Sequence, residues 1–551
     1  MLPARFLNTI RYLKPGQIVA RPGFWLKRKL LGPGSSGNES LIARDLKRLY
    51  HSTVVKNFSL TLLNVEVSFD PLYMQWKSQD WQLDERPEKL WVYQLNYFSW
   101  LFSQKTEIAQ ELQLYLILDW IEKNNSTREE TWEPFALSKR VCNWVKWLET
   151  HKELVEPIRT CIDASIYSQC HRLTYDLEYH NQANHLFENF RALFIACLHL
   201  LRNQHEMHFK LISWLTLATE NLIEQINEQF FADGGHYERS PMYHIDMLEA
   251  VEEIFAAAKE YAKFDFVADS ELLKSLFSEL IELCHEKLPL MKDWLSNLTH
   301  PDGFIALIND STLLPGLKQA ESNDKPTSYL LEESGFFIRR WNNNYFILNC
   351  GEPSPAFQPG HSHCDILSFE LSINKTRCIV DTGCGSYQNP EIRRHCRRTS
   401  SHNLPLIELS EQSDIWGAFR MGKRAKILHR SFDSQNALLI IEFADQYDQR
   451  FRREILFESR SIKIRDRMYD RRITGTFCSL IHLHPDTQIL ASNESNCLEL
   501  SRNKVEFKIK STARLRSEPH RWYPDFGKVE KSEKLILSNH LTEAIDYVIS
   551  W

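Results

Sequence analysis

The chain has 551 residues, which is too long for a single hydrophobic core, so two or more domains are expected. Hydrophobic residues make up 43% and charged residues 25%, as is usual for globular proteins. The formal net charge of −6 excludes a general attraction for nucleic acid or other polyanions. The 12 cysteines are scattered, several of them in apolar helical segments, which favours a reducing compartment over a disulfide framework.

Residues 1–39 are predicted to form a basic N-terminal arm. The arm lacks the continuous apolar region and small-residue cleavage site of a secretory signal, so a cytoplasmic location is expected, with a periplasmic or membrane-associated one as the alternative. No run approaches the length of about 18 apolar residues that a transmembrane helix needs. The arm either packs on the body of the protein or makes a peripheral contact with a membrane surface.

Residues 40–320 are predicted to be mostly helical, after a glycine-rich break at 32–38 (GPGSSGN). Apolar residues recur at three- and four-residue spacing through this region. Clear examples are 111–123 (ELQLYLILDWIEK), 140–154 (RVCNWVKWLETHKEL), 184–203 and 244–264. Many successive helices without a strict repeat indicate an α-helical bundle or an α/α toroid.

Residues 325–551 are predicted to form strands, and the domain boundary is expected around 312–326. ESGFFIRRWNNNYFILNC (333–350) has the pattern of two strands joined by an Asn-rich turn. Further short apolar strands follow at intervals typical of a β-sandwich. Helices followed by strands predict an α+β multidomain protein and not a βαβ fold.

A cluster of potential metal ligands lies within 359–403. His361 and His363 are two residues apart, so on a strand they point to the same side. With Asp381 and His402 they would make a plausible zinc site. A polar loop cluster is the simpler alternative, and nearby cysteines are alternative ligands; these are Cys364, Cys384 and Cys396.

Two further polar stretches lie in the helical region. In YHNQANHLFEN (179–189), Asn184, His185 and Glu188 open a helix, and His185 and Glu188 share a face. In FADGGHYERSPMYHID (231–246), Tyr243 starts a helix after Pro241. Taken alone, each stretch is more often explained by a helix N-cap and a structural histidine than by a functional site.

The ordered set NHLFEN, DGGHYERSPMYH and GHSHCD…IVDTG…Y…SHN resembles the heparinase II/III family. The basic arm is similar to that of bacterial members associated with capsule or exopolysaccharide assembly. The resemblance covers most of residues 85–410. It implies an N-terminal α/α toroid over 40–320, followed by a C-terminal antiparallel β-sandwich over 325–551.

The family resemblance implies a polysaccharide lyase that cleaves a uronate-containing polymer by β-elimination. Asn184 and His185 would hold and neutralise the uronate carboxylate, with His185 also a candidate base and Glu188 orienting it. Tyr243 would act as base, acid or both, provided that cationic neighbours lower its pKa. His361 would be a second base or a charge stabiliser. The residues come from both domains, so the site is expected in a cleft between them.

The resemblance also implies a structural zinc ion held by His363, Asp381 and His402, which would position His361. Tyr387, Arg397 and Arg398 lie between two of these ligands in sequence and are candidate substrate-binding residues. The arginines would bind substrate carboxylate or sulfate, or else form a solvated charge run.

Two other functions fit the same residues. One is a zinc-dependent glycan hydrolase in which the histidine cluster activates water. The other is a non-catalytic glycan-binding component of a surface-polysaccharide assembly system, which the presence of Asn184, His185, Tyr243 and His361 argues against. The sequence separates neither the uronate polymers nor endo from exo action, and it leaves the oligomeric state open.

Overall fold

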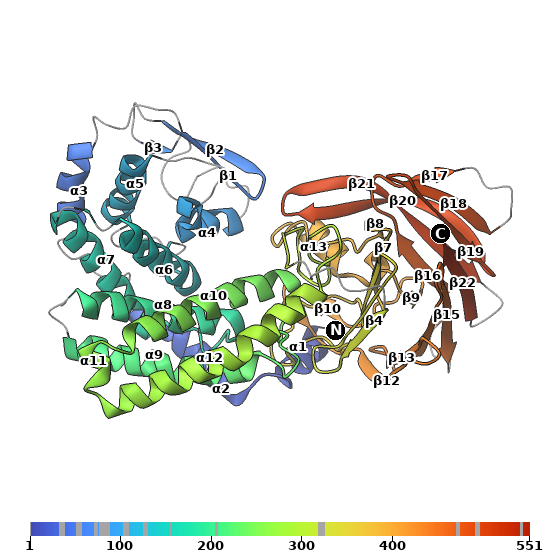
Figure 1. Ribbon diagram of the computed structural model, residues 1–551, viewed down its shortest axis with the longest axis horizontal. Coiled ribbons are helices and arrows are strands. Elements are labelled where there is room, and N and C mark those ends of the chain that lie inside the picture. The colour runs from blue at the N-terminus through green and yellow to red at the C-terminus, as the bar shows by residue number, and fades with distance from the viewer. Residues whose placement is uncertain are drawn as a thin grey trace. The chain divides into compact units, whose positions relative to one another are not determined.

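The computed structural model describes residues 2–31, 39–50, 58–70, 75–76, 89–102, 109–124, 131–151, 153–154, 156–203, 208–317, 326–469, 474–490, 496–539 and 544–551 (Figure 1). The glycine-rich break at 32–38 and residues 318–325 of the expected domain boundary lie outside them. All 12 cysteines are free and buried. Within the described ranges, no helix has the length and apolar character to cross a membrane.

The chain folds into two compact units. Unit 1 comprises Met1–Leu13, Phe230–Leu248 and Lys287–Trp551, and unit 2 comprises Lys14–Gln229 and Glu249–Glu286. Helices predominate in unit 2 and antiparallel sheets in unit 1, which confirms the predicted α+β multidomain class. The helices α10 (Pro241–Tyr261) and α12 (Glu271–Asn297) contribute residues to both units.

Unit 2 is built mainly from helices, most of which bury apolar side chains. They are α2 (Pro15–Leu31), α3 (Glu39–Tyr50), α4 (Lys89–Tyr97), α5 (Gln110–Lys123), α6 (Pro134–Thr150), α7 (Glu156–Tyr175), α8 (Ala183–Arg202), α9 (His208–Gln229) and α11 (Asp265–Ala268), with a 3-10 turn at Ser99–Phe102. A small sheet, which the sequence did not predict, is formed by β1 (Phe58–Leu62), β2 (Val65–Asp70) and β3 (Gln75–Trp76). Helix α8 is buried on almost every side and packs against α6, α7 and α9.

Unit 1 contains three larger antiparallel sheets. The five-stranded sheet has the order β4 (Thr327–Leu331), β5 (Phe336–Trp341), β6 (Asn344–Asn349), β7 (Phe369–Ile373) and β8 (Thr376–Ile379). The eight-stranded sheet has the order β12 (Lys426–Asp433), β13 (Leu438–Ala444), β14 (Arg450–Phe457), β15 (Ser461–Tyr469), β22 (Ala544–Ser550), β19 (Val505–Ser511), β18 (Cys497–Arg502) and β17 (Gln488–Leu490). The four-stranded sheet has the order β20 (Arg514–Asp525), β21 (Lys528–Asn539), β16 (Phe477–His482) and β9 (Pro405–Ile407). Helices α1 (Leu2–Ile10) and α13 (Pro390–Arg397) and the short pair β10 (Ile415–Trp416) and β11 (Arg420–Met421) complete the unit.

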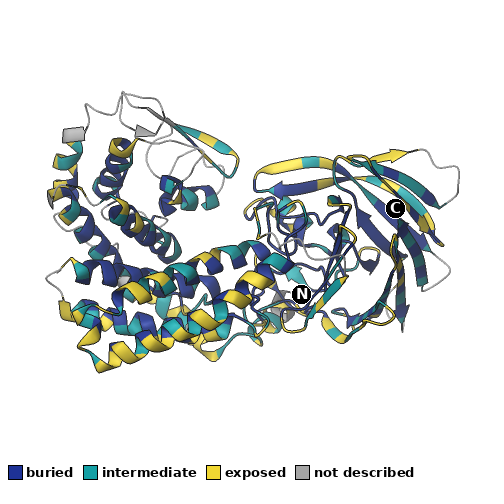
Figure 2. Ribbon diagram, viewed as in Figure 1, coloured by how far each residue is buried: buried dark blue, intermediate teal, exposed yellow. Residues whose placement is uncertain are grey.

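The three sheets of unit 1 share one apolar core. Strands β14, β15, β19 and β22 alternate between buried and more exposed residues, so each has one face toward the core and one toward solvent (Figure 2). Strands β6 and β7 are buried along their whole length. The core joins side chains from every sheet, for example Phe346, Phe369, Phe451, Ile464 and Leu537.

A buried ion pair lies within this core. Arg453 on β14 and Asp466 on β15 are fully buried and form two hydrogen bonds, both of 2.7 Å. The Arg453 guanidinium also donates to the carbonyl of Leu367 at 2.6 Å and to that of Asn403 at 2.8 Å. One side chain therefore holds the eight-stranded sheet to two of the loops that carry predicted site residues.

Replacement of Arg453 by methionine is expected to lower the free energy of unfolding by about 3–5 kcal/mol, because it leaves the Asp466 carboxylate buried without its partner. Arg465→Met is the matched control, since Arg465 lies on the same sheet, its side chain is 45% exposed and it pairs with Asp546. The control should lose less than about 1 kcal/mol. Urea denaturation followed by circular dichroism measures the free energy of unfolding of both variants. Equal losses of free energy would contradict the stabilising role of the buried Arg453–Asp466 pair.

Candidate active site

Tyr243 lies in the first turn of α10, where Pro241 begins the helix and Ser240 caps it. The Ser240 hydroxyl accepts a hydrogen bond from the Tyr243 N–H at 3.3 Å, which is the usual N-cap contact. The same hydroxyl donates to the carbonyl oxygen of Asp310 at 2.6 Å. The first turn of α10 is therefore fixed to the loop that contains Asp310.

Three of the predicted site residues lie together in unit 1. The Tyr243 hydroxyl is 2.8 Å from the Tyr387 hydroxyl, within hydrogen-bonding distance. The ring of Tyr243 packs on the imidazole of His361, with ring centroids 4.0 Å apart. Segments separated by more than a hundred residues thus place a phenol pair and an imidazole side by side.

The buried carboxylate of Asp310 connects this group to the predicted metal ligands. It accepts hydrogen bonds from His361 Nδ1 at 2.8 Å and from His363 Nε2 at 2.9 Å. It also forms a two-point ion pair with the guanidinium of Arg393. Burial alone would raise the pKa of Asp310, but Arg393 and the two histidines outweigh it and hold the pKa well below its usual range.

The phenol of Tyr243 is held in its protonated form. Burial raises its pKa well above the usual value, and the nearby Asp310 carboxylate raises it further, although the bond to Tyr387 acts in the opposite direction. A role as base was predicted on the condition that cationic neighbours lower this pKa. In the structure the pKa of Tyr243 is raised instead, first by burial and then by the Asp310 carboxylate.

Asp310 and Arg393 were not among the predicted site residues. Arg393 on α13 is buried, donates to the carbonyls of Gly360 and Ala418, and lies 4.9 Å from the centre of the Tyr387 ring. The sequence pattern singled out neither Asp310 nor Arg393, which is one of four arginines in RRHCRR (393–398).

Arg397 and Arg398, the two arginines that were predicted to bind substrate, differ in environment. Arg397 is 1% exposed and donates to the backbone carbonyls of Ser362 and Ala418, so it holds the loop that carries His361 and His363. The side chain of Arg398 is 39% exposed and lies 4.0 Å from Glu411. A contact of either arginine with substrate stays a prediction.

The predicted zinc ligands His363, Asp381 and His402 are buried near one another. His402 Nδ1 donates to Asp381 at 2.8 Å, and the rings of His363 and His402 lie 5.4 Å apart. The other nitrogen of each ring, His363 Nδ1 and His402 Nε2, is buried and has no hydrogen-bond partner among the described residues. Burial of a ring nitrogen without a partner is costly, and an unprotonated ring nitrogen has a lone pair of the kind that binds zinc.

Two imidazoles and one carboxylate fit a zinc ion in kind. Within the described ranges, however, no three His, Cys, Asp or Glu side chains are arranged to hold a metal ion. Burial would lower the pKa of His402, but Asp381 outweighs it and raises the pKa, so zinc binding would displace a proton from this ring. Burial raises the pKa of the Cys364 and Cys384 thiols, which keeps these alternative ligands protonated.

Asn184 and His185 lie in the first turn of α8 in unit 2. The chain enters this helix through Gln182 and Ala183, which have positive φ angles of 60° and 52°. Asn184 is buried, whereas the side chain of His185 is 35% exposed and its ring packs on Phe135 with centroids 4.5 Å apart. An amide and a partly exposed imidazole are thus presented at one helix end.

The carboxylate that contacts His185 is that of Glu178, at 2.9 Å from His185 Nδ1, and not that of Glu188. Glu188 is fully buried, and it bonds to Lys139 at 2.8 Å and to Arg191 at 2.8 Å. The predicted contact between Glu188 and His185 is absent, because the turn before α8 brings Glu178 to the histidine instead. Helical spacing does not predict this contact, since Glu178 lies outside α8.

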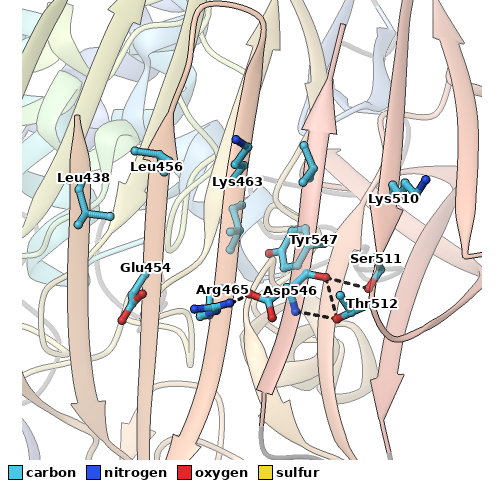
Figure 3. A pocket seen from close by; sticks show the side chains of 12 residues that line it. Leu438, Glu454, Leu456, Lys463, Arg465, Lys510, Ser511, Thr512, Asp546 and Tyr547 are labelled. Carbon is cyan, nitrogen blue, oxygen red and sulfur yellow. Dashed lines mark hydrogen bonds and ion pairs between the residues drawn. The ribbon is translucent and has the colours of Figure 1, made fainter. Parts of the chain in front are cut away.

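The pocket drawn in Figure 3 lies elsewhere, on the outer face of the eight-stranded sheet. Its volume is about 630 Å³, and an ion pair between Arg465 and Asp546 lies across it. Leucines of β13 and β14 and lysines of β15 and β19 line one side (Figure 3). None of the predicted site residues lines this pocket, so its size does not identify it as the active site.

Two family models match the chain along almost its whole length. Residues 41–315 match the heparinase II/III N-terminus, and residues 323–550 match the heparinase II/III-like C-terminal model. The chain belongs to the heparinase II/III family. The family resemblance inferred from the ordered motifs is therefore confirmed.

Characterised relatives are distant in sequence. A heparin-sulfate lyase from Pedobacter heparinus is 21% identical over 353 residues, which cover 59% of this chain and 49% of that protein, so the match spans about half of the relative's length. The crystal structure of heparinase III has a TM-score of 0.66 at 17% identity, with 92% of this chain and 88% of that chain covered. A heparan sulfate lyase structure from Pedobacter heparinus has a TM-score of 0.57 at 16% identity, with 92% and 82% covered. At these identities the structural likeness establishes the fold.

Proposed function

We propose that this heparinase II/III family member is a polysaccharide lyase that cleaves an acidic, uronate-containing polysaccharide by β-elimination. The observation that carries the proposal is the His361 imidazole, fixed by Asp310 on one side and packed against the Tyr243 phenol on the other. The names of the relatives, a heparin-sulfate lyase and heparinase III, support the same class of reaction.

The hydrogen bond to Asp310 supports the role of base for His361, and the raised pKa of Tyr243 supports the role of acid for that residue. The Asp310 carboxylate accepts the Nδ1 proton, so the lone pair of a neutral His361 lies on Nε2, where it can take the C5 proton of the uronate. The C5–H electrons form the C4–C5 double bond, and the C4–O bond breaks. Tyr243, whose raised pKa keeps it protonated, gives its proton to the departing oxygen.

Asn184 and His185 are proposed to bind the uronate carboxylate. An amide N–H and an imidazole N–H would neutralise its charge, which makes the C5 proton more acidic and stabilises the enolate that forms. Glu178 would hold the His185 ring in place through its bond to Nδ1. Glu188 would support the helix through Lys139 and Arg191 and have no direct part in the reaction.

A structural zinc ion held by His363, Asp381 and His402 is also proposed. The two unpartnered nitrogens, His363 Nδ1 and His402 Nε2, support it. The ion would join three segments of unit 1 and so help to keep His361, two residues from His363, in place.

Several finer proposals follow from the family resemblance. The helices of unit 2 would correspond to an α/α toroid, and the sheets of unit 1 to an antiparallel β-sandwich. The basic N-terminal segment supports a role in capsule or exopolysaccharide metabolism.

Incubation with a panel of uronate polymers should produce a rise in ultraviolet absorbance on at least one of them, because the product has a C4–C5 double bond conjugated to its carboxylate. Tyr243→Phe should reduce the initial rate by about 10²–10⁴-fold, since it removes the proton donor. Tyr447→Phe is the control, as Tyr447 is 50% exposed and should leave the rate unchanged.

The alternative functions give different results in the same assay. Chain cleavage detected by size without a rise in absorbance would contradict the lyase and favour a zinc-dependent hydrolase. Glycan binding without cleavage would contradict both enzymes and favour a binding component.

Metal analysis of the purified protein should find about one zinc ion per chain. His402→Ala should lose the zinc and lower the thermal midpoint of unfolding, because the remaining proposed ligands, His363 and Asp381, would no longer be joined by the ion. The control is His482→Ala, another buried histidine that is not a predicted ligand, and it should keep the zinc. Absence of zinc from the wild-type protein after refolding with zinc would refute the metal site.

A further inference from the structure

Helix α2 (Pro15–Leu31) carries its apolar side chains on the outside. Ile18, Val19 and Leu26 are 47%, 76% and 58% exposed, and Pro22 between them is exposed as well. Positions 18, 19, 22 and 26 fall on one face of a helix, so these side chains form a continuous exposed stripe. The stripe is defined here as Ile18, Val19, Pro22 and Leu26.

The opposite face of α2 is fixed to unit 2 by polar contacts. Gln17 is fully buried and accepts a hydrogen bond from the Lys14 N–H at 3.0 Å. The Lys14 ammonium lies 3.2 Å from the side-chain oxygen of Gln182 and forms an ion pair with Glu228. An amphipathic helix on a globular protein normally buries its apolar face, whereas α2 leaves this stripe exposed. The arrangement implies that another apolar surface covers the stripe.

The charge of the surrounding segment indicates which surface that is. Residues 1–31 contain no Asp or Glu and seven basic residues, which are Arg5, Arg11, Lys14, Arg21, Lys27, Arg28 and Lys29. Lysine is depleted at the apolar centre of protein–protein interfaces. A basic helix with an exposed aliphatic face is instead typical of helices that lie in the headgroup region of an anionic membrane.

We infer that α2 docks on an anionic phospholipid surface. Ile18, Val19 and Leu26 enter the boundary between headgroups and acyl chains, and the net positive charge of the segment attracts the lipid phosphates. Helix α1 of unit 1 also exposes apolar side chains, Phe6 at 55% and Leu7 at 67%, within the same basic segment. The inference does not depend on the proposed lyase activity.

Co-sedimentation of the full chain with phospholipid vesicles tests this inference. The protein should bind vesicles that contain phosphatidylglycerol, bind pure phosphatidylcholine much more weakly, and dissociate as salt is raised. Val19→Asp should weaken binding by at least about tenfold, because it places a negative charge in the centre of the stripe. Val19 is largely exposed, so this variant should fold normally, which circular dichroism checks.

Phe209→Asp is the matched control. Phe209 is 91% exposed on α9 of the same unit, lies outside the stripe, and should leave vesicle binding unchanged. Absence of binding to phosphatidylglycerol vesicles, or equal loss in both variants, would overturn the inference. Self-association of the wild-type protein in solution that Val19→Asp abolishes would overturn it too, since a second copy would then cover the stripe.

Discussion

The buried carboxylate of Asp310 is the contact on which the candidate site in unit 1 depends. It accepts hydrogen bonds from His361 and His363 and pairs with the Arg393 guanidinium. The backbone carbonyl of Asp310 accepts a hydrogen bond from Ser240, which caps α10. A buried carboxylate is stable only when its charge is fully compensated. The three partners supply that compensation, and in return each of them is held in one orientation.

This arrangement gives the two reacting groups of the proposed mechanism opposite tasks. The negative charge of Asp310 orients His361 through its Nδ1 proton, and the same charge opposes ionisation of the neighbouring Tyr243 phenol. One residue is thus prepared to accept a proton and the other to donate one. In the proposed mechanism, this charge and the burial of the phenol give the two adjacent side chains different roles.

The sequence predicted the fold class and the succession of a helical region and a strand region, because helical and strand periodicity are local. It also predicted Tyr243, His361 and Tyr387 as site residues, through motifs whose order is specific to the family. The structure places these three side chains together. The sequence could not identify Asp310 and Arg393, whose contact joins positions 83 residues apart in the chain. It assigned the carboxylate partner of His185 to Glu188 from helical spacing, whereas the turn with positive φ angles before α8 brings Glu178 there. The exposed apolar stripe of α2 could not be predicted from the sequence either, because it depends on which face of the helix packs on unit 2.

Steady-state kinetics of Asp310→Asn test whether the charge of Asp310 holds His361 in its reactive orientation, since asparagine keeps the shape of the side chain and removes its charge. The account predicts a fall in kcat of about 10- to 100-fold with KM nearly unchanged, because His361 loses its fixed orientation. Asp466→Asn, an equally buried carboxylate paired with Arg453, should lose stability and retain kcat in its folded fraction. An unchanged kcat in Asp310→Asn would contradict the account.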